Sequence, residues 1–92
     1  ILYINNMNWY ILEGHDVKIV NLLTWSEWFN TADRTIKHTK IGVAEISTVF
    51  IGTDILFETM IFGGRDDKYQ KRYETWDQAI IGHDKACELV KR

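Results

Sequence analysis

The chain has 92 residues, enough for one domain with a single modest hydrophobic core. Its net charge of −2 argues against direct nucleic-acid binding and is too weakly acidic for a DNA mimic. The single cysteine, Cys87, excludes an internal disulfide and the usual kind of structural zinc site. No apolar run approaches the roughly 20 residues that span a bilayer, and the first residues lack the basic region of a secretory signal. We therefore expect an intracellular protein without membrane contact.

The first 20 residues predict a short extension followed by a hairpin. We expect Ile1–Asn6, which precede Met7, to be a leader, an upstream extension or an expression remnant, and the rest of the chain to form one α+β domain, residues 7–92. Trp9–Glu13 and Val17–Val20 are β-prone runs on either side of the turn signal Gly14-His15-Asp16, a pattern that predicts a β-hairpin.

A helix is predicted from Thr24 to about Asp33. Thr24 and Glu27 have the spacing of a capping box, in which each side chain accepts a hydrogen bond from the other residue's backbone N–H. The residues at helical spacing on one face are Trp25, Trp28, Phe29 and Ala32. We expect this face to belong to the core. Aromatic rings in this arrangement also suit a stacking or docking platform, so Trp25 is a candidate binding residue.

The next segments predict an edge strand and a central hairpin. Arg34–Ile41 carries several cations and predicts a polar edge strand, whose charges either prevent unwanted pairing or bind phosphate. Ala44–Ile51 and Ile55–Phe62 are the most apolar and β-prone runs of the chain, and Gly52-Thr53-Asp54 between them is a turn signal.

The second central strand is apolar on both faces. Alternation places Ile55, Phe57, Thr59 and Ile61 on one side and Leu56, Glu58, Met60 and Phe62 on the other. A strand of this kind is typically covered on both sides or packed against another molecule. Glu58 is the exception on its face. Because burying an unpaired carboxylate is costly, we expect Glu58 at a rim, in a salt bridge or in a site.

After this hairpin, Gly63-Gly64 predicts a turn with positive φ angles, followed by a strand over Lys68–Glu74. The pair is not a phosphate loop, because no Gly-Lys-Ser/Thr sequence follows it. Two adjacent glycines close to Arg65 and Lys68 would nevertheless allow the backbone to approach an anionic ligand. Both cations are therefore candidate binding residues.

The last predicted helix begins after Thr75, which has capping-box spacing to Gln78. Its expected buried face contains Trp76, Ala79, Ile80, His83, Ala86, Cys87 and Val90. His83 on this apolar face is typical of a core histidine hydrogen-bonded to a backbone group or a carboxylate, and less often of a catalyst or ligand. Gly82 in mid-helix is unfavourable by about 1 kcal/mol relative to alanine, and close packing against the sheet would explain it.

The element order is strand, strand, helix, four strands, helix. It predicts a two-layer α+β domain with an antiparallel sheet of about five to six strands and two helices on one face. Two helices cover only one side of such a sheet. We therefore expect a homodimer formed through the other side.

Four blocks of the sequence carry a resemblance to a known family. They are WYILEGHDVK near the start, STVFIG at Ser47–Gly52, LFETMIFGG at Leu56–Gly64 and YETWDQAIIGH at Tyr73–His83. The chain resembles a family of small uncharacterised phage and prophage proteins from Met7 onward. Relatives in this family carry a longer Gly/Pro-containing loop between the central strands, which is shortened here to Gly52–Ile55. The resemblance implies a phage setting, and hence the cytoplasm of a bacterial host cell, but brings no established activity.

Three functions follow from these observations. The leading hypothesis is a non-catalytic phage protein that binds a host protein, as an anti-defence inhibitor of the anti-CRISPR kind. The second is a sequestering protein for a small anionic ligand such as a signalling nucleotide, held in a dimer groove by Arg65, Lys68 and an aromatic ring. We expect no cofactor and no metal site. The six candidate binding residues are Trp25, Asp54, Glu58, Arg65, Lys68 and His83.

The third hypothesis is a small enzyme. Glu58 and His83 would form an acid–base pair if the last helix packed on the Glu58 face of the sheet, with Asp54 or Asp84 orienting the histidine. The same pair would serve equally well as a buried structural hydrogen bond, which we favour.

Overall fold

The computed structural model describes residues 7–92, so the expectation for residues 1–6 lies outside the described part of the chain. The predicted α+β class and element order are confirmed. The elements are β1 (Trp9–Glu13), β2 (Asp16–Val20), α1 (Leu22–Thr31), β3 (Thr35–Ile41), β4 (Ala44–Phe50), β5 (Phe57–Phe62), β6 (Gln70–Tyr73) and α2 (Trp76–Lys91).

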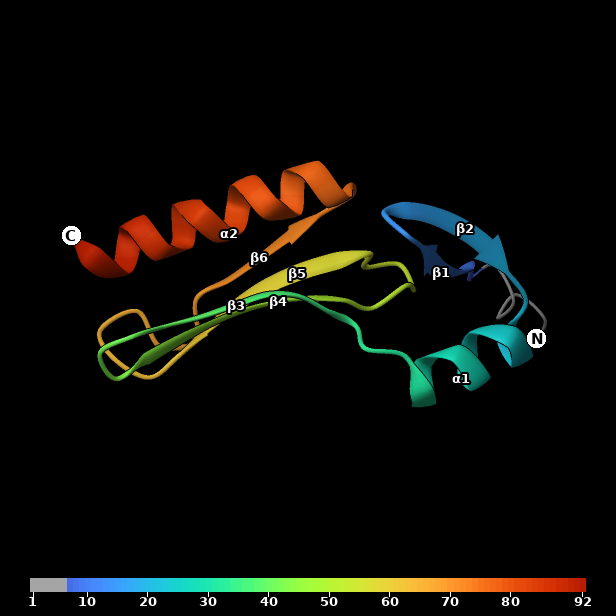
Figure 1. Cartoon of the computed structure of the whole chain (residues 1–92), viewed down its shortest axis with the longest axis horizontal. Helices are drawn as coiled ribbons and strands as arrows, with labels where there is room; N and C mark the ends of the chain where they lie inside the picture. The colour runs from blue at the N-terminus through green and yellow to red at the C-terminus, as the bar shows by residue number, and fades with distance from the viewer. Residues whose placement is uncertain (1–6) are drawn as a thin grey trace.

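The six described strands form two antiparallel sheets instead of one. The larger sheet has the order β3-β4-β5-β6, and the smaller is the hairpin β1-β2. Helix α2 lies along one face of the larger sheet, whereas α1 lies beyond the end of that sheet beside the hairpin (Figure 1). The two helices therefore cover different parts of the molecule. As predicted from its charges, β3 is an edge strand; β6 is the other edge.

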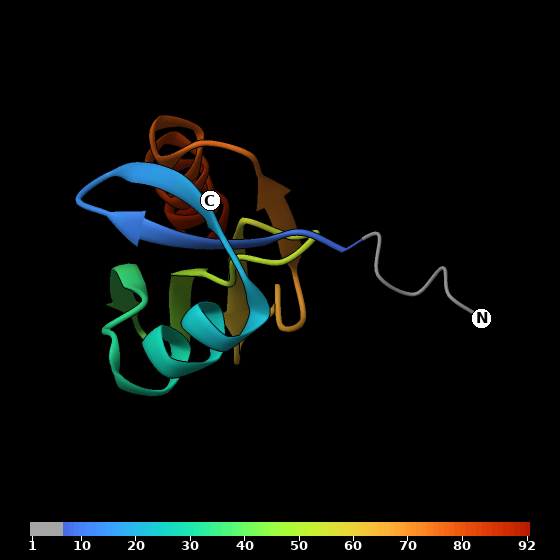
Figure 2. The same cartoon turned by 90° about the vertical axis from the view of Figure 1, so that its right-hand side faces the viewer.

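The hairpin and α1 are attached at the loop between β4 and β5. The Tyr10 N–H donates to the Gly52 carbonyl at 2.7 Å, and the Trp25 indole donates to the Ile51 carbonyl at 3.1 Å. Gly52 has a φ of +84°, and a Cβ there would lie 2.2 Å from the Tyr10 carbonyl oxygen. Only glycine allows this approach of two backbones. Figure 2 shows the hairpin crossing the end of the molecule beside this loop.

The core lies between α2 and the larger sheet. Phe50 and Phe57, a cross-strand pair, are fully buried with their ring centroids 5.0 Å apart in an edge-to-face arrangement. A second cluster around Ile46, Ile61 and Ala86 continues the core toward the C-terminus of α2. Burying side chains of this size stabilises a fold by roughly 1.5–3 kcal/mol each, so this layer fixes the position of α2.

The start of α1 differs from the prediction. Asn21, and not Thr24, is the N-cap, and its side chain accepts from the Thr24 N–H at 2.8 Å. Thr24 therefore lies in the first turn of the helix. The prediction that the aromatic face of α1 belongs to the core is confirmed in part. Trp28 packs edge-to-face on Phe50, with the ring centroids 5.6 Å apart, but no residue of α1 is buried.

The start of α2 follows the prediction. Thr75 is the N-cap and accepts from the Gln78 N–H at 3.1 Å. The Gln78 side chain reaches back to the N–H of Glu74, one residue before the cap. The predicted inner face is also confirmed, since the buried residues of α2 are Ala79, Gly82, His83, Ala86 and Cys87.

Candidate functional site

His83 is a fully buried core residue on the covered side of the sheet. Its Nδ1 lies 2.7 Å from the Thr48 hydroxyl and its Nε2 lies 2.9 Å from the Thr39 hydroxyl. Thr48 also shares a short hydrogen bond with Thr59 of the neighbouring strand. The partners are hydroxyls and not the expected backbone group or carboxylate. The ring is thus hydrogen-bonded at both nitrogens by neutral groups.

The charge state of His83 follows from these surroundings. Burial lowers the pKa of His83 below its ordinary value, and the positive charge of Lys37 lowers it further, while Asp84 acts in the opposite direction. The ring is therefore neutral at pH 7. A neutral, buried histidine between two threonines holds α2 against β3 and β4, which is a structural role.

Tyr73 explains the mid-helix glycine. A Cβ on Gly82 would lie 2.2 Å from the Tyr73 ring and hydroxyl, so the ring occupies the place of a side chain there. The Tyr73 hydroxyl oxygen is buried and has no hydrogen-bond partner among the described residues. Burial raises the pKa of Tyr73, and the nearby Thr59 side chain acts in the opposite direction.

Glu58 does not meet His83. It lies on the side of β5 away from α2, where its carboxylate accepts from the Arg72 guanidinium at 3.0 Å. The proposed acid–base pair is therefore divided by the sheet, and the expected salt bridge of Glu58 is present. Asp84 does not orient the histidine either, because its carboxylate binds Lys37 at 2.8 Å on the helix surface. That contact lowers the pKa of Asp84.

The face of the larger sheet opposite α2 is uncovered among the described residues, and we call it the open face (Figure 1). By strand register it carries His38, Lys40, Glu45, Ser47, Val49, Glu58, Met60, Phe62, Gln70 and Arg72. Arg72 binds Glu58 there, and the His38 Nε2 lies 3.1 Å from the Glu45 carboxylate. Phe62, the last residue of β5, is 51% exposed.

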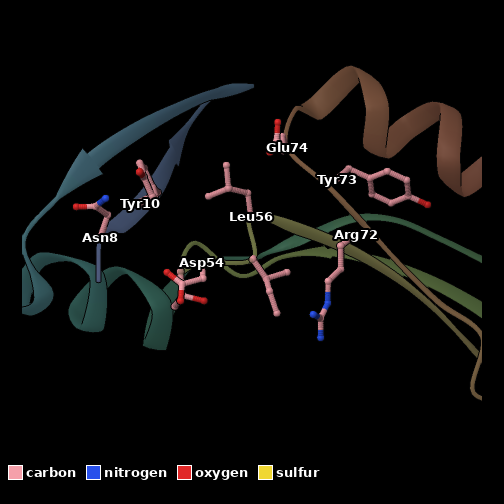
Figure 3. A pocket seen from close by; sticks show the side chains of 9 residues that line it. Asn8, Tyr10, Asp54, Leu56, Arg72, Tyr73 and Glu74 are labelled. Atoms are coloured by element: carbon pink, nitrogen blue, oxygen red, sulfur yellow. The ribbon is translucent and has the colours of Figure 1, made fainter. Parts of the chain in front are cut away.

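The largest cavity, about 720 Å³, lies between the hairpin, the β4–β5 loop and the end of β6, and we call it the hairpin pocket (Figure 3). It is lined by Asn8, Tyr10, Thr53, Asp54, Ile55, Leu56, Arg72, Tyr73 and Glu74. Asp54 is thus the one predicted site residue that lines it. The single cation that lines the hairpin pocket, Arg72, is already bound to Glu58. Two carboxylates and no free cation make the hairpin pocket unsuited to an anionic ligand.

A second cavity, about 370 Å³, runs between β6 and α2, and we call it the β6–α2 groove. It is lined by Tyr69, Lys71, Arg72, Tyr73, Gln78, Ile81, Gly82 and Lys85, and none of these carries a carboxylate. Figure 3 shows the Arg72 side chain turned away from α2, so Lys71 and Lys85 are the cations of this groove. Neither lysine forms an ion pair with a residue of the described chain.

The remaining predicted residues are not brought together. Arg65 lines a separate cavity near the C-terminus and donates to the Arg92 carbonyl at 3.0 Å, with Asp66 3.9 Å away. Lys68 is exposed, lines none of the described cavities and has a φ of +73°. Trp25 packs on Trp9 and Phe29 and holds the β4–β5 loop. The expected anion site around Arg65 and Lys68 is thus not formed within one chain.

The sequence did not indicate Lys71 and Lys85 as neighbours. They lie 14 positions apart on different elements, and only the packing of α2 on the sheet places them beside one cavity. One signal was present: Gly82 marks the point where α2 approaches β6 closely, and it lies in the wall of this groove.

Comparisons with known proteins give no family for this chain. No protein-family model matches it, and no curated protein or solved structure matches it either. Within residues 7–92, no helix is both long enough and apolar enough to cross a membrane. No group of three or more His, Cys, Asp or Glu in that range could hold a metal ion. The surfaces described above are therefore the basis for a function.

Proposed function

We propose that the protein is a non-catalytic, dimeric binding protein of phage or prophage origin that acts on a host protein, as an inhibitor of a defence system such as CRISPR interference. The observation that carries the dimeric part of the proposal is the open face. It displays Val49, Met60 and Phe62 among charged side chains of both signs, which is the chemistry of a protein contact surface.

A second copy of the chain is the occupant that fits the open face. Around a two-fold axis, a face with charges of both signs meets itself, so cations can approach the partner's carboxylates. Four strands at ~4.8 Å spacing and about six residues at ~3.4 Å rise give a flat footprint of roughly 400 Å². Stable dimers bury about 800 Å² of accessible surface per partner. The proposed dimer is therefore weak and forms with rising concentration.

Inhibition is tested in bacteria that carry an active CRISPR system directed against a phage. Expression of the wild-type chain should restore plaque formation. The variant Met60→Lys/Phe62→Glu should lose this effect, whereas Leu23→Glu, at an exposed apolar residue on α1, should keep it. Absence of restored plaques across several defence systems with well-expressed wild-type protein would count against the anti-defence role.

A second candidate function is favoured by the β6–α2 groove. A cavity with two unpaired lysines and no lining carboxylate suits an anionic ligand better than any other described surface. The protein would then act by sequestering that ligand, and its site would be this groove in place of the predicted Arg65 and Lys68 region.

A further inference from the structure

The β6–α2 groove is bordered by a free sheet edge. β6 is the last strand of the larger sheet and, among residues 7–92, pairs only with β5. The Ile61 N–H donates to the Tyr69 carbonyl at 3.1 Å. Because hydrogen-bonded and non-hydrogen-bonded pairs alternate along an antiparallel ladder, Lys71 and Tyr73 direct their backbone groups toward β5, as Tyr69 does with its carbonyl. The backbone N–H and C=O groups of Gln70 and Arg72 therefore point out of the sheet at the free edge.

The groove walls supply further contacts on the α2 side. Gln78, Ile81 and Lys85 recur along one stripe of the helix and line the groove. Ile81 is 57% exposed, and the Gln78 side-chain NH₂ forms no hydrogen bond with the described residues while its oxygen accepts from Glu74. The groove thus offers an apolar contact, amide donors and two ammonium groups beside the free edge of β6.

The length of the groove fits a short peptide. Tyr69 to Tyr73 on the strand span about 13 Å at ~3.3 Å per residue. Gln78 to Lys85 on the helix span about 10 Å at 1.5 Å per residue. An extended segment of four to six residues would lie along both walls. Edge strands flanked by a helix are known to take peptides by strand addition, in which backbone bonds give affinity and the groove selects side chains.

We propose that the β6–α2 groove binds an acidic peptide segment of the partner protein, which adds to the free edge of β6 as a fifth strand. Lys71 and Lys85 select carboxylate side chains on the face of the peptide that points toward α2. This inference rests on the proposed binding of a host protein, and it places that contact on a surface separate from the open face. A lysine on an edge strand also discourages pairing with neutral or basic strands, so the selection is for acidic segments.

The test is a titration of the ¹⁵N-labelled full chain with three probes: the capped peptide Ac-EVEVEV-NH₂, its neutral analogue Ac-QVQVQV-NH₂, and ATP. The proposal predicts binding of the acidic peptide, with slowed hydrogen exchange at the amides of Gln70 and Arg72. Affinity for it should fall by about tenfold or more in Lys71→Glu/Lys85→Glu, because each reversal replaces an attraction by a repulsion. The matched variant Lys18→Glu/Lys91→Glu, with the same change in net charge, should bind as the wild type does.

Each other outcome overturns a different claim. Binding of ATP without binding of the acidic peptide would overturn strand addition and leave the sequestering function in place. Peptide binding without protection of Gln70 and Arg72 would overturn the fifth strand. Equal binding of both peptides would overturn the role of the lysines. Binding of none of the probes would overturn both uses of the groove, whereas self-association through the open face is measured separately by sedimentation.

Discussion

The two faces of the four-stranded sheet are built from the same strands but have opposite environments. On β5, Phe57, Thr59 and Ile61 are fully buried under α2, whereas Met60 and Phe62 remain partly or largely exposed on the other side. On the covered face His83, Thr39, Thr48 and Thr59 hydrogen-bond one another, while on the open face Arg72 of β6 pairs with Glu58 of β5. The difference indicates that α2 fixes the fold, and it is the basis for the proposal that the open face makes an intermolecular contact.

The contrast is tested most strongly by removing one phenylalanine from each face. Phe57→Ala should lower the free energy of unfolding by about 3–5 kcal/mol, because Phe57 is fully buried against Phe50. Phe62→Ala should change it by no more than about 0.5 kcal/mol. Urea denaturation followed by tryptophan fluorescence measures both, and Phe57→Leu provides a milder variant if the alanine variant does not fold. Similar losses at the two positions would show that the open face is covered within the monomer.

The packing of α2 is tested by adding one methyl group. Gly82→Ala should lower the free energy of unfolding by about 1–3 kcal/mol, because the Cβ of the alanine would collide with the Tyr73 ring. This loss is expected although alanine is the better helix former. Tyr73→Leu in the same chain should recover part of that loss by making room. The comparison uses thermal and urea unfolding of the single and double variants. A stabilised Gly82→Ala variant would contradict the close contact.

The buried histidine predicts a pH dependence of stability. The folded-state pKa of His83 is lowered, so below about pH 6.5 the unfolded chain binds more protons than the folded chain. Stability should therefore fall as the pH drops from 7 toward 5 and should level off above 7. His83→Gln should be less stable by about 1–3 kcal/mol at pH 7, since the threonine hydroxyls lose their partner, but should show a flatter profile in this range. An unchanged slope in the variant would assign the effect to other groups.

A small effect is expected on the open face, at the ion pair of Glu58 and Arg72. Glu58→Gln keeps the shape and should cost about 0.2–1 kcal/mol, as for a pair whose arginine is half exposed. Arg72→Met should cost more, because it leaves a nearly buried carboxylate without its partner. Urea unfolding of the two variants measures which one loses more free energy of unfolding. A larger loss for Glu58→Gln than for Arg72→Met would mean that water solvates the Glu58 carboxylate well without Arg72.

Much of the fold could be predicted from local sequence signals. The central hairpin stands out because its two runs are rich in apolar and β-branched residues, and the cap at Thr75 is unambiguous. The cap of α1 could not be predicted in the same way, because Asn21 and Thr24 both have a suitable spacing to a following N–H. The position of α1 is set instead by tertiary contacts, in which Trp25 reaches the Ile51 carbonyl.

The candidate site depended on information that is not local. Both faces of β5 are similarly apolar in sequence, so alternation alone could not decide which one α2 covers. That choice separates Glu58 from His83 and removes the acid–base hypothesis. The separation of the hairpin from the main sheet likewise depends on the contact of Gly52 with Tyr10, which links residues 42 positions apart.

The central claim is that the open face is an intermolecular contact, and sedimentation velocity at several concentrations tests it most directly. The wild-type chain should pass from monomer to dimer as its concentration rises through tens of micromolar, and Met60→Lys/Phe62→Glu should remain monomeric. Leu23→Glu should associate like the wild type. A wild-type chain that remains strictly monomeric across this range would contradict self-association through the open face.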